Sequence, residues 1–205
     1  MSLDLEIAHQ RRWPGKPINL ISILVLLSSS PGLRLLLIHR FARRWYLKSK
    51  ENCRMRLIWR LLIIPLGLLK LVFRINSKSD LRHDIEIEDG IFLSDQGQIM
   101  YGAIKTGAGT VIESRVTVGI NRSSKKHANI GRNVWVGSGC VIYGGINVGN
   151  GATLLPGTVL TKSIPPGVVV HGNPARIVQR NFDNSELRNG VNIDVNYLFK
   201  IKQEN

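Results

Sequence analysis

An aliphatic residue recurs every sixth position over the second half of this chain, with one position skipped. An α-helix repeats at about 3.6 residues and a strand alternates at two, so neither explains this spacing. A short fixed period of this kind is typical of a solenoid, in which each unit buries one side chain against its neighbours. The residues in this register are Ile112, Val118, Ile130, Val136, Ile142, Val148, Leu154 and Leu160.

The repeat predicts a particular solenoid, a triangular parallel β-helix. Each six-residue unit is a short strand and a turn, and three units close a coil of about 18 residues. Successive coils stack at about 4.8 Å and pair backbone to backbone. Glycine and asparagine, which accept tight turns at little cost, occupy the expected corners in GRN, GSG, YGG and GNG. We therefore expect a mainly β fold over residues 83–178.

The ends of the repeat indicate how the solenoid is bounded. The polar stretch NRSSKKHAN, residues 121–129, interrupts the register and predicts a loop. After residue 178 the pattern stops, and residues 179–205 are expected to form an irregular arm or short helix over the β-helix. Because a solenoid needs caps, we expect the N-terminal segment, residues 1–82, to be α-helical and to cover one end.

Charge is concentrated in that N-terminal segment. Residues 1–82 hold 16 Lys and Arg against 4 Asp and Glu, a net of +12, whereas the rest of the chain has a net of +2. A basic surface of this kind attracts phosphate, in nucleic acid or in anionic lipid. Nothing resembles a helix-turn-helix or a zinc finger, so a nucleic-acid partner is not expected.

Two apolar runs, Ile18–Leu27 and Leu57–Ile75, lie among these basic residues. The first is shorter than the roughly 20 residues of a spanning helix, and polar residues, proline and glycine interrupt the second. With Trp45 and Tyr46 nearby, one interpretation is helices lying on an anionic membrane. The other is helices that bury their apolar faces against each other or a partner subunit. The N-terminus does not resemble a secretory signal, and we expect a cytoplasmic protein, peripheral at the inner face of the cell membrane.

The cysteine count is low. Cys53 and Cys140 lie in different segments without metal-ligand spacing. This favours free thiols in a reducing compartment.

The closing segment PPGVVVHGNPARIV, together with the repeat IGRNVWVGSGCVIYGGINVGNGATLLPGTVLTKSI before it, resembles the hexapeptide-repeat acyltransferases. Within that family the chain is similar to the serine acetyltransferases and to the capsule and colanic-acid acetyltransferases. The resemblance implies a left-handed β-helix and a homotrimer. It also implies that acetyl-CoA binds in a groove between neighbouring subunits, that a histidine is the general base, and that no metal takes part.

The resemblance implies candidate catalytic residues. His127, in RSSKKHANIG, falls on an active-site histidine of the family. The family's main catalytic histidine has no counterpart in GIFLSDQGQIMYG, where Asp95, or Ser94 if a one-residue gap falls earlier, takes its place. We expect His127 to act as general base with Asp95 orienting it. His127 as a backbone-bonded loop residue, or as a substrate-holding residue, remains open.

The resemblance also implies cofactor contacts. Two corners match the family's pantetheine-facing turns, and two basic positions match those that meet the phosphates of CoA. The corner residues are Gly137, Ser138, Gly139, Pro156, Gly157 and Thr158, and the basic residues are Lys162 and Arg176. Lys125 and Lys126 are further candidates for CoA phosphates or an acidic sugar.

The main hypothesis is an O-acetyltransferase that acts on a sugar hydroxyl of a surface polysaccharide or its precursor. Free serine is an alternative acceptor. A second class of function is a catalytically impaired trimeric scaffold that docks a partner enzyme, motivated by the aspartate at position 95.

Overall fold

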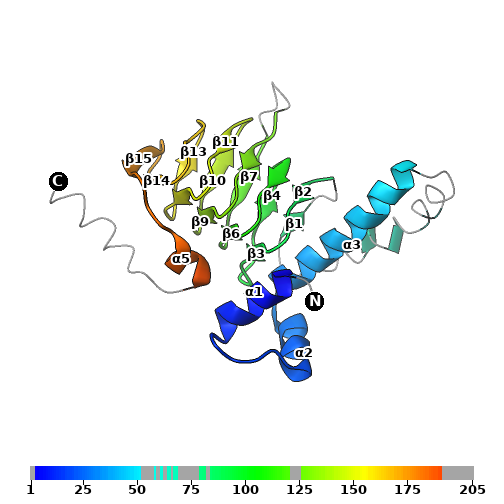
Figure 1. Cartoon of the computed structure of the whole chain (residues 1–205). Helices are drawn as coiled ribbons and strands as arrows, with labels where there is room; N and C mark the ends of the chain where they lie inside the picture. The colour runs from blue at the N-terminus through cyan, green and yellow to red at the C-terminus, as the bar shows by residue number, and fades with distance from the viewer. Residues whose placement is uncertain are drawn as a thin grey trace.

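A computed structural model describes residues 3–51, 58, 61, 64, 65, 67, 68, 79–81, 84–120 and 126–190. The predicted helical segment begins with three helices, α1 (Leu3–Arg12), α2 (Leu20–Ser29) and α3 (Pro31–Glu51). Most of the second apolar run, with Cys53, His83 and Lys125, lies outside the described residues. A β-helix follows the helices, and the short helix α5 (Ser185–Asn189) comes after it (Figure 1).

Fourteen of the strands stack in parallel into three sheets, and β15 closes the third sheet in antiparallel fashion. Sheet A contains β1 (Asp80–Leu81), β4 (Met100–Tyr101), β7 (Thr117–Gly119), β10 (Val141–Tyr143) and β13 (Val159–Leu160). Sheet B contains β2 (Glu86–Ile87), β5 (Lys105–Thr106), β8 (Asn129–Ile130) and β11 (Asn147–Val148). Sheet C contains β3 (Phe92–Leu93), β6 (Val111–Ile112), β9 (Trp135–Val136), β12 (Thr153–Leu154), β14 (Val169–His171) and β15 (Arg176–Gln179).

The chain passes from sheet A to B to C in each coil, as a triangular β-helix requires. All eight residues of the six-residue register are buried, with at most 3% exposure, so the predicted interior is confirmed. The second coil is less regular: Tyr101 and Thr106 take inward positions and bond to each other through their hydroxyls at 2.7 Å. Because these two inward residues are not aliphatic, the six-residue pattern of aliphatic residues is not visible in this part of the sequence.

The outer faces of the three sheets differ in polarity. Sheet B presents charged and amide side chains to solvent: Glu86, Lys105, Asn129 and Asn147. Sheet C is apolar but covered, because Phe182 and Leu187 of the C-terminal arm pack on Val111 and Trp135. This agrees with the expected arm over the β-helix. Sheet A presents Met100, Thr117, Val141 and Val159 without such a cover from the described residues.

The helical segment caps the first coil. Two arginines of α3 donate to backbone carbonyls that the first strands leave unpaired. Arg43 reaches the carbonyl oxygens of Asp84 and Ile85 at 2.9 and 2.7 Å, and Arg40 reaches those of Ile87 and Glu88. The sequence predicted a cap, and these bonds confirm it.

Asp4 of α1 completes the cap from the other side. Its buried carboxylate accepts bonds from the backbone N–H groups of Gly90 and Ile91 at 2.8 and 3.0 Å. It also pairs with Arg40 at 3.0 Å. One network therefore joins α1, α3 and the start of sheet C.

Local sequence sets the positions of α2 and α3. Asn19 begins α2 with a capping box. Its side-chain oxygen accepts from the backbone N–H of Ser22, and the hydroxyl of Ser22 accepts from the backbone N–H of Asn19. Pro31 opens α3, at the helix position that suits proline. At Gly32 a Cβ would lie 2.2 Å from the carbonyl oxygen of Leu93, so glycine lets α3 start directly against the first coil.

Within the described residues, α2 and α3 meet the length and hydropathy criteria for a membrane span only when taken together, and a bend of 94° separates them.

Candidate active site

His127 lies where the chain passes from sheet A to sheet B, on a corner that we call the A–B edge. Its Nδ1 is 2.7 Å from the carbonyl oxygen of Gly102. A carbonyl oxygen can only accept, so Nδ1 carries the proton and donates. In the neutral ring the lone pair then lies on Nε2, the atom that a general base uses. The backbone bond that the sequence allowed for a loop histidine therefore also fixes the tautomer that catalysis needs.

The surface around His127 is kept open by glycines. At Gly102 a Cβ would lie 2.8 Å from the carbonyl oxygen of Val118, and at Gly119 it would lie 3.3 Å from the ring of Tyr143. Gly102, Gly119 and Tyr143 follow one another on neighbouring strands of sheet A. The half-exposed Tyr143 therefore lies on the same edge as His127 and has a hydroxyl that can bind an acceptor.

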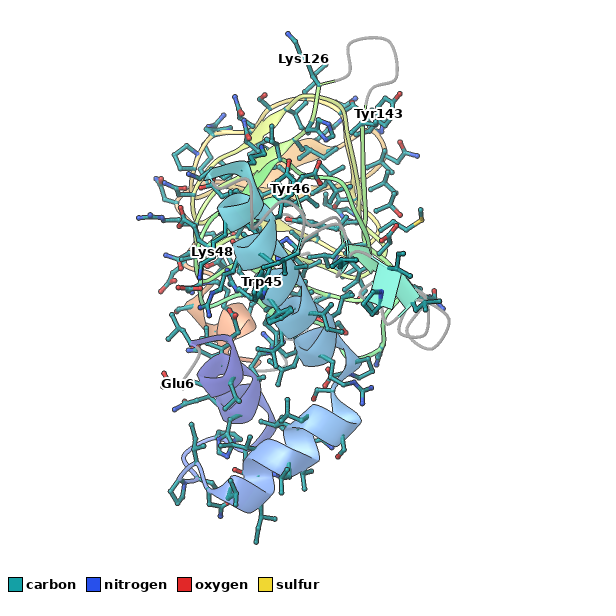
Figure 2. All side chains as sticks on the ribbon, turned by 90° about the vertical axis from the view of Figure 1, so that its right-hand side faces the viewer. Glu6, Trp45, Tyr46, Lys48, Lys126 and Tyr143 are labelled. Atoms are coloured by element: carbon teal, nitrogen blue, oxygen red, sulfur yellow. The ribbon has the colours of Figure 1, made fainter. Side chains whose placement is uncertain are left out.

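Lys126 lies beside this group. Its side chain passes over Gly145, where a Cβ would be 2.3 Å from the Cβ of Lys126. Figure 2 shows Lys126 and Tyr143 at the same end of the molecule. Sequence reasoning missed Tyr143; the signal was an aromatic residue directly after the buried Ile142, where the strand below has Gly119.

Lys162 and Arg176, the predicted phosphate contacts, are brought together. Both line one cavity of about 370 Å³, next to Pro174 and Ile177. Lys162 follows β13 on the A–B edge, two coils beyond His127. At about 4.8 Å per coil this separation is about 10 Å along the edge. The cavity and the imidazole therefore lie on one continuous edge.

The predicted pantetheine corners lie elsewhere, on the corner between sheets C and A, the C–A edge. Gly139 and Gly157 turn there with positive φ of 73° and 75°. Ser138 is partly exposed and bonds to Ser114 at 3.3 Å. Thr158 is fully buried, and its hydroxyl donates to the carbonyl oxygen of Leu155 at 2.5 Å. The Thr158 side chain is therefore turned into the coil, and a contact of this corner with a cofactor through its backbone stays a prediction.

Asp95 also lies on the C–A edge. Its carboxylate accepts from the hydroxyl of Ser30 at 3.1 Å and from the backbone N–H of Gly32, at the start of α3. Burial raises the pKa of this carboxyl, and the bonds from Ser30 and Gly32 and the charges of Arg12 and Arg34 partly offset that rise. Within one chain, therefore, Asp95 holds α3 and does not orient His127.

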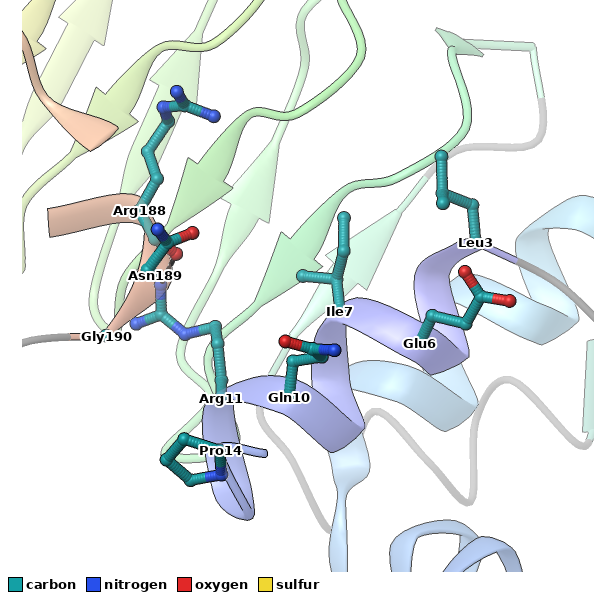
Figure 3. Close-up of a pocket in the computed structure, with 9 residues that line it drawn as sticks. All are labelled: Leu3, Glu6, Ile7, Gln10, Arg11, Pro14, Arg188, Asn189 and Gly190. Carbon is teal, nitrogen blue, oxygen red and sulfur yellow. Dashed lines mark hydrogen bonds between the residues drawn. The ribbon is translucent and has the colours of Figure 1, made fainter. Parts of the chain in front are cut away.

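A separate cavity of about 600 Å³ lies between α1 and α5, lined by Arg11, Arg188 and Gly190 among others (Figure 3). Arg11 donates there to the carbonyl oxygen of Arg188 at 2.6 Å and pairs with Glu113 at 2.9 Å. Burial lowers the pKa of Arg11 and raises that of Glu113. None of the predicted catalytic or cofactor residues lines this cavity. Arg11 instead holds α1 against α5.

Metal chemistry has no candidate ligand group in the part of the chain that the structure describes, since no three His, Cys, Asp or Glu side chains gather there.

Comparison with known proteins identifies the repeat. Residues 127–162 match the family model "Bacterial transferase hexapeptide (six repeats)". A serine acetyltransferase of Buchnera aphidicola subsp. Schizaphis graminum is 36% identical over 86 residues, 38% of this chain and 33% of that protein. The galactoside O-acetyltransferase of Escherichia coli is 38% identical over 71 residues, 35% of this chain and 30% of that protein. The matches thus span about a third of the length of these curated relatives.

Solved structures show the same architecture. Serine acetyltransferase from Brucella abortus, in complex with coenzyme A, superposes with a TM-score of 0.70 at 23% identity, covering 88% of this chain and 68% of that one. Soybean serine acetyltransferase complexed with serine gives a TM-score of 0.67 at 27% identity, over 85% and 66% of the two chains. The left-handed parallel β-helix expected from the sequence is confirmed.

The fold and the repeat define a class, the left-handed β-helix proteins built from hexapeptide units. Within that class, residues 127–162 match the hexapeptide-repeat transferase family, and the proteins similar to this chain include serine, galactoside and chloramphenicol acetyltransferases.

Proposed function

We propose that this protein transfers an acetyl group from acetyl-CoA to a hydroxyl group of an acceptor. The observation that carries the proposal is the hydrogen bond from His127 to the carbonyl of Gly102, which leaves Nε2 as a base on the outer surface of the A–B edge. The cavity of Lys162 and Arg176 on that edge adds two cations that suit the phosphates of CoA.

The residues present support a simple mechanism. Nε2 of His127 accepts the proton of the acceptor hydroxyl while the oxygen attacks the thioester carbonyl carbon. The bond to sulfur then breaks, and the imidazolium returns the proton to the leaving thiolate. The carbonyl of Gly102 stabilises the imidazolium during this exchange, because Nδ1 keeps its bond. The thioester is already activated, so orientation and one base supply most of the rate enhancement.

The arrangement of the edges supports a trimer with sites between subunits. The predicted residues fall on two edges, A–B and C–A, which border opposite sides of the outer face of sheet A. One chain cannot bring these edges together. A cyclic assembly that packs through sheet A would place the A–B edge of one subunit beside the C–A edge of the next, because its interfaces are heterologous. The exposed Met100 and the half-buried Val141 and Val159, which no described residue fully covers, suit such packing.

The comparisons favour free serine over a polysaccharide as the acceptor, because serine acetyltransferases recur among both the relatives and the solved structures. A sugar hydroxyl is the second candidate, supported by the galactoside O-acetyltransferase relative. Asp95 is a departure from the family pattern at the expected acceptor side. It stands at the position of the family's main histidine, so the acceptor side of this site differs from the pattern.

Thiol release from acetyl-CoA, measured in the presence of L-serine, a galactoside or a nucleotide sugar, tests the proposal. We expect turnover with at least one of these hydroxyl compounds and its loss in the variant His127→Ala. Calorimetry with CoA separates the scaffold hypothesis from the enzyme. Absence of binding at millimolar CoA would support a scaffold and contradict the transferase.

A further inference from the structure

Helix α2 is apolar on two faces. Its inner face packs Leu26 and Leu27 against Ala8 of α1 and Leu33 of α3. Its outer face bears four large aliphatic side chains that the described part of the chain leaves uncovered: Leu20, Ile21, Leu24 and Val25, exposed by 73, 72, 59 and 38%. These four positions form one stripe along the helix, since residues four apart lie above one another. Full burial of one such side chain contributes about 1.5–3 kcal/mol, so this outer face favours a partner.

The charges around α2 indicate what the partner is. Among the described side chains of residues 3–50, every exposed charged residue is basic: Arg12, Lys16, Arg44, Lys48 and Lys50. The acidic side chains of residues 3–50 are less exposed than these basic ones. Asp4 is buried against Arg40, and Glu6 is half-buried. An apolar stripe in a basic surround complements an anionic, apolar surface.

Two of the basic residues lie at the ends of α2. Arg12 donates to the hydroxyl of Ser29, at the C-terminal end of the helix, at 2.8 Å. Lys16 precedes the capping residue Asn19 at the N-terminal end. The stripe is therefore flanked at both ends by an exposed cation. This pattern is typical of helices that lie in the headgroup layer of a membrane.

The geometry favours a lateral role for α2 over a spanning one. Ten residues give a helix of about 15 Å, half the roughly 30 Å of a hydrocarbon core. α3 cannot extend it, because α3 turns away by 94° and is bonded along the first coil through Arg40 and Arg43. Figures 1 and 2 both show α2 on the far side of the helical cap from the β-helix, where a flat surface can reach it.

We propose that α2 docks the protein on a membrane that contains anionic phospholipid, with Leu20, Ile21, Leu24 and Val25 inserted among the acyl chains and Arg12 and Lys16 at the headgroups. This surface is separate from the A–B edge, so the inference does not depend on the acetyl-transfer activity. In a trimer the three copies of α2 would lie at the same end of the assembly, and binding through three weak sites would be strengthened by avidity.

Sedimentation of the full-length protein with vesicles of phosphatidylcholine alone, or with about one third phosphatidylglycerol, tests the proposal. We expect binding to the anionic vesicles, at least tenfold weaker binding to neutral ones, and a decline with added salt. The double variant Leu20→Gln/Leu24→Gln is expected to bind about tenfold more weakly. Lys16→Gln is expected to weaken binding to anionic vesicles by a few-fold and leave binding to neutral vesicles unchanged.

Controls separate docking from folding and from self-association. Leu47→Gln replaces an aliphatic side chain of similar exposure, 44%, near the far end of α3, and is expected to bind like the wild type. Leu20 and Leu24 are exposed, so their replacement should leave the thermal transition unchanged. Equal binding of the double variant, or equal binding to both vesicle types, would overturn the proposal. A change in sedimentation coefficient of the double variant in the absence of lipid would overturn it too, because the stripe would then be a contact between copies of this chain.

Discussion

The Nδ1 atom of His127 donates a hydrogen bond to the carbonyl oxygen of Gly102, at 2.7 Å. The carbonyl oxygen of Gly102 thus fixes which nitrogen of the imidazole carries the proton. A base that is held in one tautomer needs no rearrangement before it accepts a proton.

His127→Ala is therefore expected to reduce kcat by about 10²- to 10⁴-fold, the usual contribution of a general base. The KM for acetyl-CoA should change little, because the cavity of Lys162 and Arg176 is two coils away. Asn129→Ala, two residues further on and exposed on sheet B, is the matched control. Steady-state kinetics measure both variants, and an unchanged kcat in His127→Ala would remove the base from the mechanism.

Gly102→Ala tests the positioning of the base. A Cβ at residue 102 would lie 2.8 Å from the carbonyl oxygen of Val118, so the strand must shift and move the acceptor of the His127 bond. A displacement of about 1 Å can cost up to about 100-fold in rate. We expect a lower kcat with unchanged affinity for CoA by calorimetry. If kcat stays at the wild-type value, the bond to Gly102 has no catalytic role.

Lys162 and Arg176 share a cavity, and their removal tests its assignment to the CoA phosphates. Lys162→Ala and Arg176→Ala are each expected to raise the KM for acetyl-CoA about tenfold, the loss of one charge-assisted hydrogen bond. The salt dependence of KM should become shallower, because one cation fewer is screened. Lys105→Ala, which removes an exposed lysine paired with Glu86 on sheet B, is the control. An effect on kcat alone would contradict the assignment.

Much of the fold could be predicted from the sequence because each coil must fill its interior with one aliphatic residue per side. The eight predicted interior residues are all buried for that reason. The first two coils were harder to predict. Strand β1 begins at Asp80, three residues before the expected boundary, and the Tyr101–Thr106 pair replaces two aliphatic residues of the register.

The site was predicted only in part. A repeat determines the coil on which a residue lies, but it does not determine which other segments of the chain pack against that residue. His127, Lys162 and Arg176 fall on or beside one edge, but the resemblance did not specify that they share it. The role of Asp95 depends on a helix packed against it, through Ser30 and Gly32, and the spacing of the repeat contains no information on that contact. The hydroxyl of Thr158 points inward because it donates to a backbone carbonyl oxygen within the coil, which the repeat spacing does not predict either.

Sheet A is expected to mediate the trimer. Met100→Glu introduces a charge at a side chain that is 57% exposed in the single chain and lies on the outer face of sheet A, within the proposed contact. A buried unpaired carboxylate costs several kcal/mol, so we expect monomers in analytical ultracentrifugation. Asn129→Glu makes a comparable change on the polar outer face of sheet B and should leave the assembly intact. A trimer that persists in Met100→Glu would place the interface on another face.

Asp4 is expected to be critical for the helical cap. Asp4→Asn retains an oxygen for the N–H groups of Gly90 and Ile91 but removes the buried counter-charge of Arg40, which then keeps only the exposed Asp89 at 3.2 Å. Removal of one partner from such a pair costs about 3 kcal/mol, and thermal unfolding measures the loss. Glu6→Gln on the same helix, where the side chain is half-buried, is the control. Equal transition temperatures for the two variants would show that the cap does not depend on this network.

Cys140 provides a test of the closed interior of the β-helix. Burial raises the pKa of its thiol to about 11, and the thiol donates to the carbonyl oxygen of Leu155 at 3.2 Å. Because the thiolate is the reactive form, roughly one molecule in a thousand would carry it at pH 8 even if reagent could enter. In a Cys53→Ser background we expect no reaction of the native protein with a disulfide reagent at pH 8, and one thiol per chain after unfolding in guanidinium. Rapid modification of the native protein at that pH would mean that the coil around Cys140 opens far more readily than its packing indicates.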